Sequence, residues 1–98
     1  MKLYRAVSEE ELDDLLESRR FRVAGNSVEG KYFAEESTHA VIWGDALHGS
    51  GRYRIVEVEL PDSDAAEFYR WTRLDAIGPA RFARIEQLAR ATVREVTP

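Results

Sequence analysis

The chain has 98 residues and no cysteine, so it can form neither a disulfide nor a zinc–thiolate site. A composition of 44% hydrophobic and 33% charged residues at this length is typical of one globular domain, which we take to span residues 1–98. The formal charge of −4 argues against a protein built mainly to coat nucleic acid, because that task requires a basic surface.

The first predicted element is a short strand with an arginine in its middle. Residues 3–7 alternate between two sides, and Arg5 shares its side with two apolar residues. The guanidinium offers a fork of donors that matches a phosphate group, so Arg5 is a candidate for binding one. The alternative is an ion pair across the sheet with a glutamate of a later strand, either Glu57 or Glu59.

A capping box predicts the start of a helix directly after this strand. Ser8 can cap the helix, and Glu11 follows three residues later in a run of glutamates that suits the helix dipole. The leucines predicted to form the buried stripe are Leu12, Leu15 and Leu16. After the helix, residues 21–23 are predicted as a short strand and residues 24–30 as a mobile loop.

The stretch from residue 31 to residue 44 is predicted to be a strand that leads straight into a helix. The strand covers residues 31–34, and Ser37 or Thr38 can cap the helix. Such a junction collects unpaired backbone N–H groups and the positive end of the helix dipole, which suits an anionic or amide-bearing ligand. Aromatic rings beside the junction can hold a flat heterocycle, and the alternative is that they only pack in the core. The residues predicted on the inner face of the helix are Ala40, Trp43 and Leu47.

The second half of the chain is predicted to be mainly strands joined by irregular segments. In order, we expect a strand over residues 53–60, a short amphipathic helix carrying Phe68 and Trp71, an ordered loop over 74–83, a helical turn over 84–88 and a closing strand over 92–96. The loop is predicted because Gly78-Pro79 interrupts the apolar run.

Few residues suggest metal or nucleophilic chemistry. His39 and His48 are nine positions apart, which does not place them on one helical face at ligand spacing. We therefore expect no metal site.

Four segments resemble a known family. Leu-Tyr-Arg-Ala-Val-Ser at 3–8, Val-Glu-Gly-Lys-Tyr-Phe-Ala at 28–34, Ala-Val-Ile-Trp-Gly at 40–44 and Leu-Asp-Ala-Ile-Gly-Pro-Ala-Arg-Phe-Ala at 74–83 are similar to small ADP-ribosyltransferase-fold toxin domains. Those domains lie at the C-termini of bacterial Rhs-type and related polymorphic toxins. The resemblance covers nearly the whole chain and implies a compact α+β fold with two small, mostly antiparallel sheets and short helices.

The resemblance also implies roles for particular residues. Arg5 matches the arginine that binds NAD near its diphosphate and ribose, and Tyr32 and Phe33 match the aromatic strand that holds the nicotinamide, with Ser37 as a helper. Glu86 matches the late glutamate that bonds the ribose 2′-hydroxyl.

Further residues remain open for the same site. Glu57 and Glu59 are alternatives to the late glutamate, and Arg81 is a further candidate for binding NAD. An RNA target would need a basic patch, for which the candidates, unless they are ordinary solvated side chains, are Arg19, Arg20, Arg22, Arg81, Arg84 and Arg90.

The implied function is NAD-dependent transfer of one ADP-ribose group to a protein or nucleic-acid target, with NAD as substrate and no metal. A cognate immunity protein is a further implied partner. One alternative is a non-catalytic member of the fold that binds a partner protein or a nucleotide. Another is RNA 2′-phosphate transfer, although neither His39 nor His48 lies in the first strand, where that chemistry would need one.

No apolar run approaches the ~18–20 residues of a membrane span and no signal peptide is evident, so we expect a cytoplasmic protein, in its own cell or delivered into another, with no membrane partner.

Overall fold

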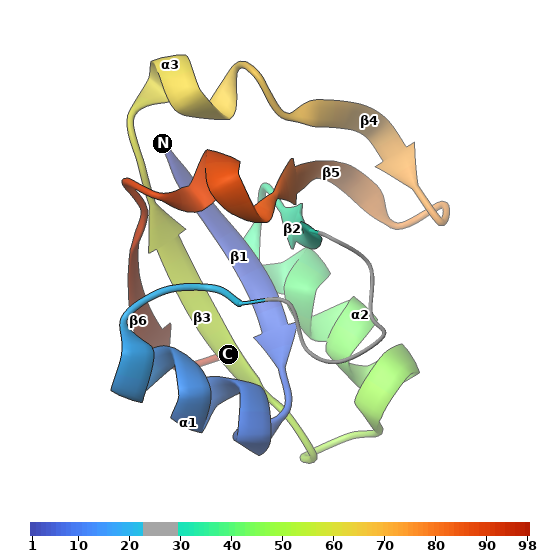
Figure 1. The fold of residues 1–98 in the computed structure, drawn as a ribbon. Coiled ribbons are helices and arrows are strands. Elements are labelled where there is room, and N and C mark those ends of the chain that lie inside the picture. Colours follow the sequence, from blue (N-terminus) through green and yellow to red (C-terminus); the bar gives the residue numbers. More distant parts are fainter. Residues whose placement is uncertain (23–29) are drawn as a thin grey trace.

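The structure is a computed structural model that describes residues 1–22 and 30–98. In chain order its elements are β1 (Lys2–Val7), α1 (Glu9–Ser18), β2 (Gly30–Ala34), α2 (Ser37–His48), β3 (Arg54–Glu59), α3 (Asp62–Ala65), β4 (Tyr69–Leu74), β5 (Gly78–Arg84), the 3-10 turn η1 (Ile85–Leu88) and β6 (Thr92–Val96) (Figure 1). In this part of the chain no helix is long and apolar enough to cross a membrane. The predicted α+β class is confirmed.

The strands form one antiparallel sheet in the order β4-β5-β2-β1-β3-β6, so the prediction of two sheets is wrong. Two groups of strands are joined into this one sheet by a narrow junction, at which β1 and β2 share the single pair Tyr4–Ala34. The β1–β3 register, by contrast, runs without a break from Lys2–Glu59 to Val7–Arg54. We call β4-β5-β2 the hairpin half and β1-β3-β6 the central half. One residue pair joins two well-paired halves, and between them the strands diverge.

The helix α1 begins as its sequence predicts and then departs from the prediction in two details. The Ser8 hydroxyl accepts a hydrogen bond from the Glu11 backbone N–H at 3.1 Å, as expected for an N-cap. The Glu11 carboxylate does not return to the cap, because it binds Arg5 instead. Leu12 and Leu15 are buried, but Leu16 is 43% exposed, since the helix packs on the sheet through a narrower stripe.

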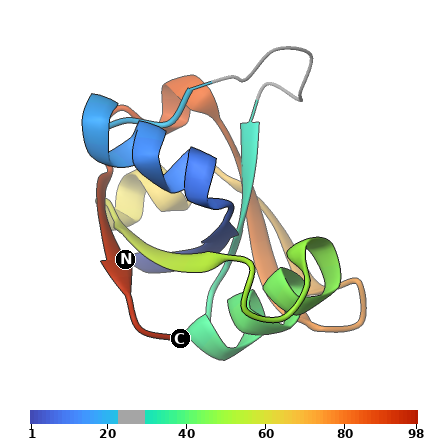
Figure 2. The same cartoon turned by 90° about the horizontal axis from the view of Figure 1, so that it is seen from below.

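The two faces of the sheet carry different cores, and α1 and α2 lie on opposite sides of β1 and β3 (Figures 1 and 2). The face under α1, α3 and η1 holds the large core, made of Leu3, Val7, Leu12, Leu15, Phe21, Phe33, Val56, Val58, Leu60, Ala65, Phe68, Ala83 and Leu88. The face under α2 holds a small cluster of Ala6, Ala34, Ala40 and Ile55. The alternation predicted for residues 53–60 is confirmed, because Val56 and Val58 face the large core and Ile55 faces the small cluster.

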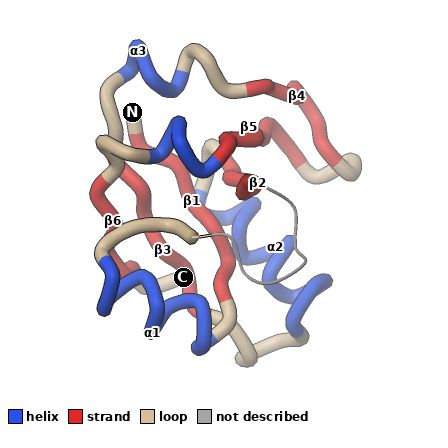
Figure 3. The backbone as a smooth tube through the Cα atoms, viewed as in Figure 1, coloured by secondary structure: helices blue, strands red, loops and turns tan. Residues whose placement is uncertain are grey.

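The segment after β3 was predicted least well. The helix α3 ends at Ala65, and Trp71 lies on strand β4 rather than on a helix (Figure 3). Residues predicted as a loop form β5, because Gly78-Pro79 begins a strand there instead of interrupting one. A Cβ on Gly78 would lie 2.4 Å from the His39 ring, so glycine allows β5 to approach α2 closely.

The remaining differences lie around β2. Phe21 is buried in edge-to-face contact with Phe33, at 5.5 Å between ring centroids, and residues 21–22 are not a strand. Residues 23–29, where the end of that strand and most of the loop were predicted, lie outside the described residues. The N-cap of α2 is Glu36 without a side-chain bond, so Ser37 is the first helical residue rather than the cap.

Candidate functional site

A cleft with a volume of about 430 Å³ lies on the α2 face, beside the junction of the two halves of the sheet. It is enclosed by β1, β2 and β5, by α2 and by the β4–β5 turn. Its lining residues are Tyr4, Arg5, Ala6, Tyr32, Phe33, Ala34, Ala40, Trp43, Leu47, Leu74, Asp75 and Ala80. Three alanines of the small cluster, Ala6, Ala34 and Ala40, form part of this wall, and their short side chains leave the space that the cleft occupies.

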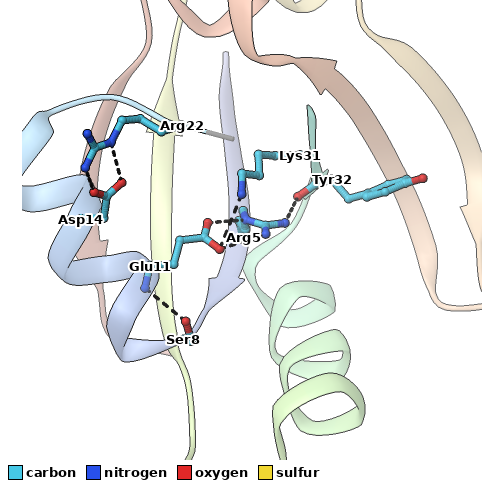
Figure 4. Close-up of polar contacts among 7 residues, drawn as sticks. All are labelled: Arg5, Ser8, Glu11, Asp14, Arg22, Lys31 and Tyr32. Atoms are coloured by element: carbon cyan, nitrogen blue, oxygen red, sulfur yellow. Dashed lines mark hydrogen bonds and ion pairs between the residues drawn. The ribbon is translucent and has the colours of Figure 1, made fainter. Parts of the chain in front are cut away.

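Arg5 occupies the gap where β1 and β2 diverge (Figure 4). Its Nη1 donates to the Tyr32 backbone carbonyl at 3.1 Å, and its Nε and Nη2 donate to the Glu11 carboxylate at 2.8 and 3.1 Å. The predicted alternative, an ion pair with Glu57 or Glu59, is therefore wrong. Those glutamates could not reach it, because Arg5 is paired in register with Val56 and shares its face of the sheet.

Lys31 joins this group from β2, although the sequence analysis did not single it out. Its side chain is only 10% exposed, and its Nζ lies 4.0 Å from Glu11 Oε1. Two cations, Arg5 and Lys31, thus share the single carboxylate of Glu11 at the gap (Figure 4). Of the two cations only Arg5 lines the cleft, where its guanidinium suits an anionic ligand.

The two aromatic residues predicted to hold a nicotinamide point to opposite faces of β2. Tyr32 is 45% exposed on the cleft face, with its ring 4.9 Å from the Phe82 ring and 5.8 Å from that of Trp71. Phe33 is fully buried in the large core, so its side chain belongs to the packing of the other face.

Arg81 and Ser37 lie away from the cleft lining. The Arg81 guanidinium donates to Glu35 Oε2 and to the Ala65 carbonyl, each at 2.8 Å, on the face opposite Tyr32. Hydrogen bonds from Arg70 and from Arg81 hold the pKa of Glu35 below its ordinary value. Ser37 lies in the first turn of α2 and does not line the cleft.

The late glutamate is separated from Arg5. Glu86 is exposed on η1, where its carboxylate accepts a 2.7 Å hydrogen bond from Arg84 Nε, and it lines a different and more open hollow with Arg90 and Gln87. Arg5, Tyr32 and Phe33 therefore line one cleft, and Glu86 does not line it.

The alternative carboxylates, Glu57 and Glu59, both lie on β3. Glu57 is buried and accepts hydrogen bonds from Arg94 at 3.0 Å and from the Tyr4 hydroxyl at 3.4 Å. The bond from Arg94 is the main reason that the pKa of Glu57 lies below its ordinary value. Glu59 is exposed at the end of β3.

Asp75 was missed in the sequence analysis, although it is the one acidic residue among the described residues lining the cleft. Its Oδ2 accepts a 3.2 Å hydrogen bond from the Trp43 indole N–H, which ties the β4–β5 turn to α2. Asp75 and Ala76 both have left-handed backbones, with φ of 55° and 60°. Aspartate tolerates this conformation and alanine does not favour it, so Asp75 is the only one of the two residues that signals the turn in the sequence.

No family model, no curated protein and no solved structure matches this chain. In the part of the chain that the structure describes, no group of three or more metal-ligating side chains comes together. The geometry of the cleft therefore carries the functional argument.

Proposed function

We propose that the chain is a NAD-dependent mono-ADP-ribosyltransferase, acting as a bacterial toxin domain on a protein or nucleic-acid target in the cytoplasm. The observation that carries the proposal is the meeting of Arg5 and Tyr32 at one cleft, in the gap between the two halves of the sheet. A volume of about 430 Å³ lies in the usual range for small-molecule sites.

The binding step would use the charge at the gap. Arg5 lines the cleft, so a diphosphate entering the gap would gain charge-assisted hydrogen bonds from its guanidinium, while Lys31, on the opposite face of β2 from Tyr32, offsets part of the charge of Glu11. The exposed ring of Tyr32 offers a flat surface for the nicotinamide. Glu11 already holds the Arg5 guanidinium in position, so little ordering remains to be done when the ligand binds.

The chemical step needs a carboxylate near the ribose. Breaking the bond to nicotinamide develops positive charge on the ribose ring, and a fixed carboxylate stabilises that charge. Glu86 is the carboxylate that the family resemblance implies, and Asp75 is the one that lines the cleft. Each is a candidate, and one experiment separates them.

The experiment follows the transfer of label from isotope-labelled NAD to targets in a cell lysate. Substitution of the acting carboxylate, in Asp75→Asn or Glu86→Gln, should lower labelling by about 10²–10³-fold, as for the loss of an electrostatic group elsewhere. Glu10→Gln, an exposed change on α1, is the control and should leave labelling unchanged. Full labelling by both Asp75→Asn and Glu86→Gln would remove both residues from the mechanism, and no labelling by the unaltered chain would contradict the proposal.

A second candidate function is nucleotide or partner binding without transfer. The distance of Glu86 from the cleft and the occupation of Arg5 by Glu11 favour it. Calorimetry separates the two: NAD binding without nicotinamide release would favour the non-catalytic module. An absence of NAD binding together with a stable partner in a pull-down would favour a protein-binding role.

A further inference from the structure

Four aromatic rings form a continuous surface on the cleft face of the hairpin half, which we call the aromatic strip: Tyr32, Tyr69, Trp71 and Phe82. Phe82 lies opposite Tyr32 on one side and opposite Tyr69 on the other, so these three rings cross all three strands in one row. Trp71 follows on the same face of β4. Tyr69 and Trp71 lie 4.5 Å apart between ring centroids.

The strip is exposed at its two tyrosines, half-buried at Trp71 and Phe82, and continuous with the cleft. Tyr69 is 64% exposed and Tyr32 is 45% exposed, although both are large aromatic residues. Tyr32 belongs to both features, because its ring contacts Trp71 and Phe82 and it also lines the cleft. A molecule lying on the strip would therefore reach the cleft at Tyr32.

The charged residues nearest to the strip are Arg84 and Arg73, and the acidic Asp75 lines the cleft beside it. The positions that share the face are Gly30, Tyr32 and Ala34 on β2, Tyr69 and Trp71 on β4, and Ala80, Phe82 and Arg84 on β5. None of these described positions is acidic, although the chain has a formal charge of −4. Arg84 forms an exposed ion pair with Glu86, in which a phosphate group could take the place of the Glu86 carboxylate. Arg73 follows Trp71 along β4 and is exposed, and its Nε donates to the Ala76 backbone carbonyl at 3.3 Å.

We propose that the aromatic strip binds single-stranded nucleic acid by stacking its bases, and that this nucleic acid is the acceptor of the ADP-ribose. The acceptor role rests on the proposed function, whereas the binding does not. Exposed aromatic rings on a sheet face, with arginines but no acid among them, are what unpaired bases and their phosphates require.

The transfer balances without a further reactant. The bond between the nicotinamide nitrogen and ribose C1′ breaks, and the bonding electrons leave with nicotinamide. A nitrogen of a base held on the strip, at the side of C1′ away from the nicotinamide, forms the new bond to C1′ and releases its proton to water.

The test measures binding of a fluorescent single-stranded oligonucleotide, DNA or RNA, by anisotropy and without NAD. Trp71→Ala and Tyr69→Ala should each weaken binding by about fivefold or more, the loss of one stacked base. Ile42→Ala, an exposed apolar change on α2, is the matched control and should leave affinity unchanged. Because only about two arginines contact phosphate, the slope of log affinity against log salt should be shallow, about −1.4.

The outcomes separate this proposal from the proposed function. No binding of either oligonucleotide, or equal effects of Trp71→Ala and Ile42→Ala, would overturn the strip proposal even if NAD is turned over. Binding that depends on Trp71, with no transfer of label from NAD, would keep the strip and remove the transferase. Labelled product that protease destroys and nuclease does not would identify a protein acceptor and overturn the acceptor role. Circular dichroism of each variant confirms that the fold is intact.

Discussion

The two faces of the sheet have been built in opposite ways. The face under α1, α3 and η1 is filled by leucine, valine and phenylalanine side chains that leave the large core closed. The face under α2 is lined by alanines around one isoleucine, and it keeps a cleft of about 430 Å³. Apolar burial supplies most of the stability of a small domain, so the first face contributes most to holding the fold together, and the second keeps an open cleft.

The two faces of the sheet are connected at the gap between β1 and β2. Arg5 projects from the same side of β1 as Leu3 and Val7, yet it reaches the cleft because β1 and β2 diverge next to it. A fully paired sheet would have kept this guanidinium on the core face. The narrow junction between the halves is therefore the feature that gives a residue of the closed face access to the open one.

The largest expected loss of stability comes from truncating a side chain in the large core. Leu3 is fully buried in the large core, so Leu3→Ala should lower the free energy of unfolding by about 2–5 kcal/mol. On the other face, Leu47 lines the cleft but is 73% exposed, and Leu47→Ala should change stability by no more than about 0.5 kcal/mol. Urea unfolding of the two variants checks the contrast. Similar losses for both would show that the two faces contribute alike.

A smaller effect is expected at the gap between the faces. Glu11→Gln keeps the shape of the side chain but leaves Arg5 and Lys31 without their carboxylate, so it should cost about 1.5–3 kcal/mol, the range for hydrogen bonds to charged groups. The exposed neighbour Glu10, changed to glutamine, is the control. If the two variants unfold at the same urea concentration, the cluster at the gap does not stabilise the sheet.

The smallest effect concerns the polar edge of the closed face. Hydrogen bonds from Arg70 and Arg81 lower the pKa of Glu35 below its ordinary 4.5, so their stabilisation is fully present above that value and is lost as the pH falls through the lowered pKa. The Tm of Glu35→Gln should therefore lie below that of the unaltered chain at about pH 7, and the difference should shrink towards about pH 3. A difference that is constant over this range would mean that the charge of Glu35 is not involved.

Local patterns predicted the elements whose signals lie within the element itself. The alternation in residues 3–7, 53–60 and 92–96 predicted β1, β3 and β6, and Ser8 predicted the start of α1. Arg5, Tyr32 and Phe33 were recognised as notable from their types and positions. The geometry brings Arg5 and Tyr32 to one cleft, whereas the Phe33 ring packs on the opposite face and Glu86 lines another hollow.

Signals that depend on distant partners were misjudged. Trp71 follows a helix signal, yet it lies on a strand because β5 pairs beside it, and β5 in turn pairs with β2. Asp75 was not predicted as a site residue, because its contact with Trp43 forms only when the β4–β5 hairpin folds back over α2. Leu16 continues a helical stripe in the sequence but extends past the surface that α1 covers.

The sequence by itself determined the α+β class, most of the strands and the start of α1 at Ser8, because these depend on neighbours within a few residues. Only the tertiary structure decided that the sheet is single, that β1 and β2 meet at one pair, and that Glu11 rather than Glu57 or Glu59 binds Arg5. Pairing between strands and the contacts of charged side chains are fixed by segments far apart in the chain. Their free energy exists only when the whole domain has folded.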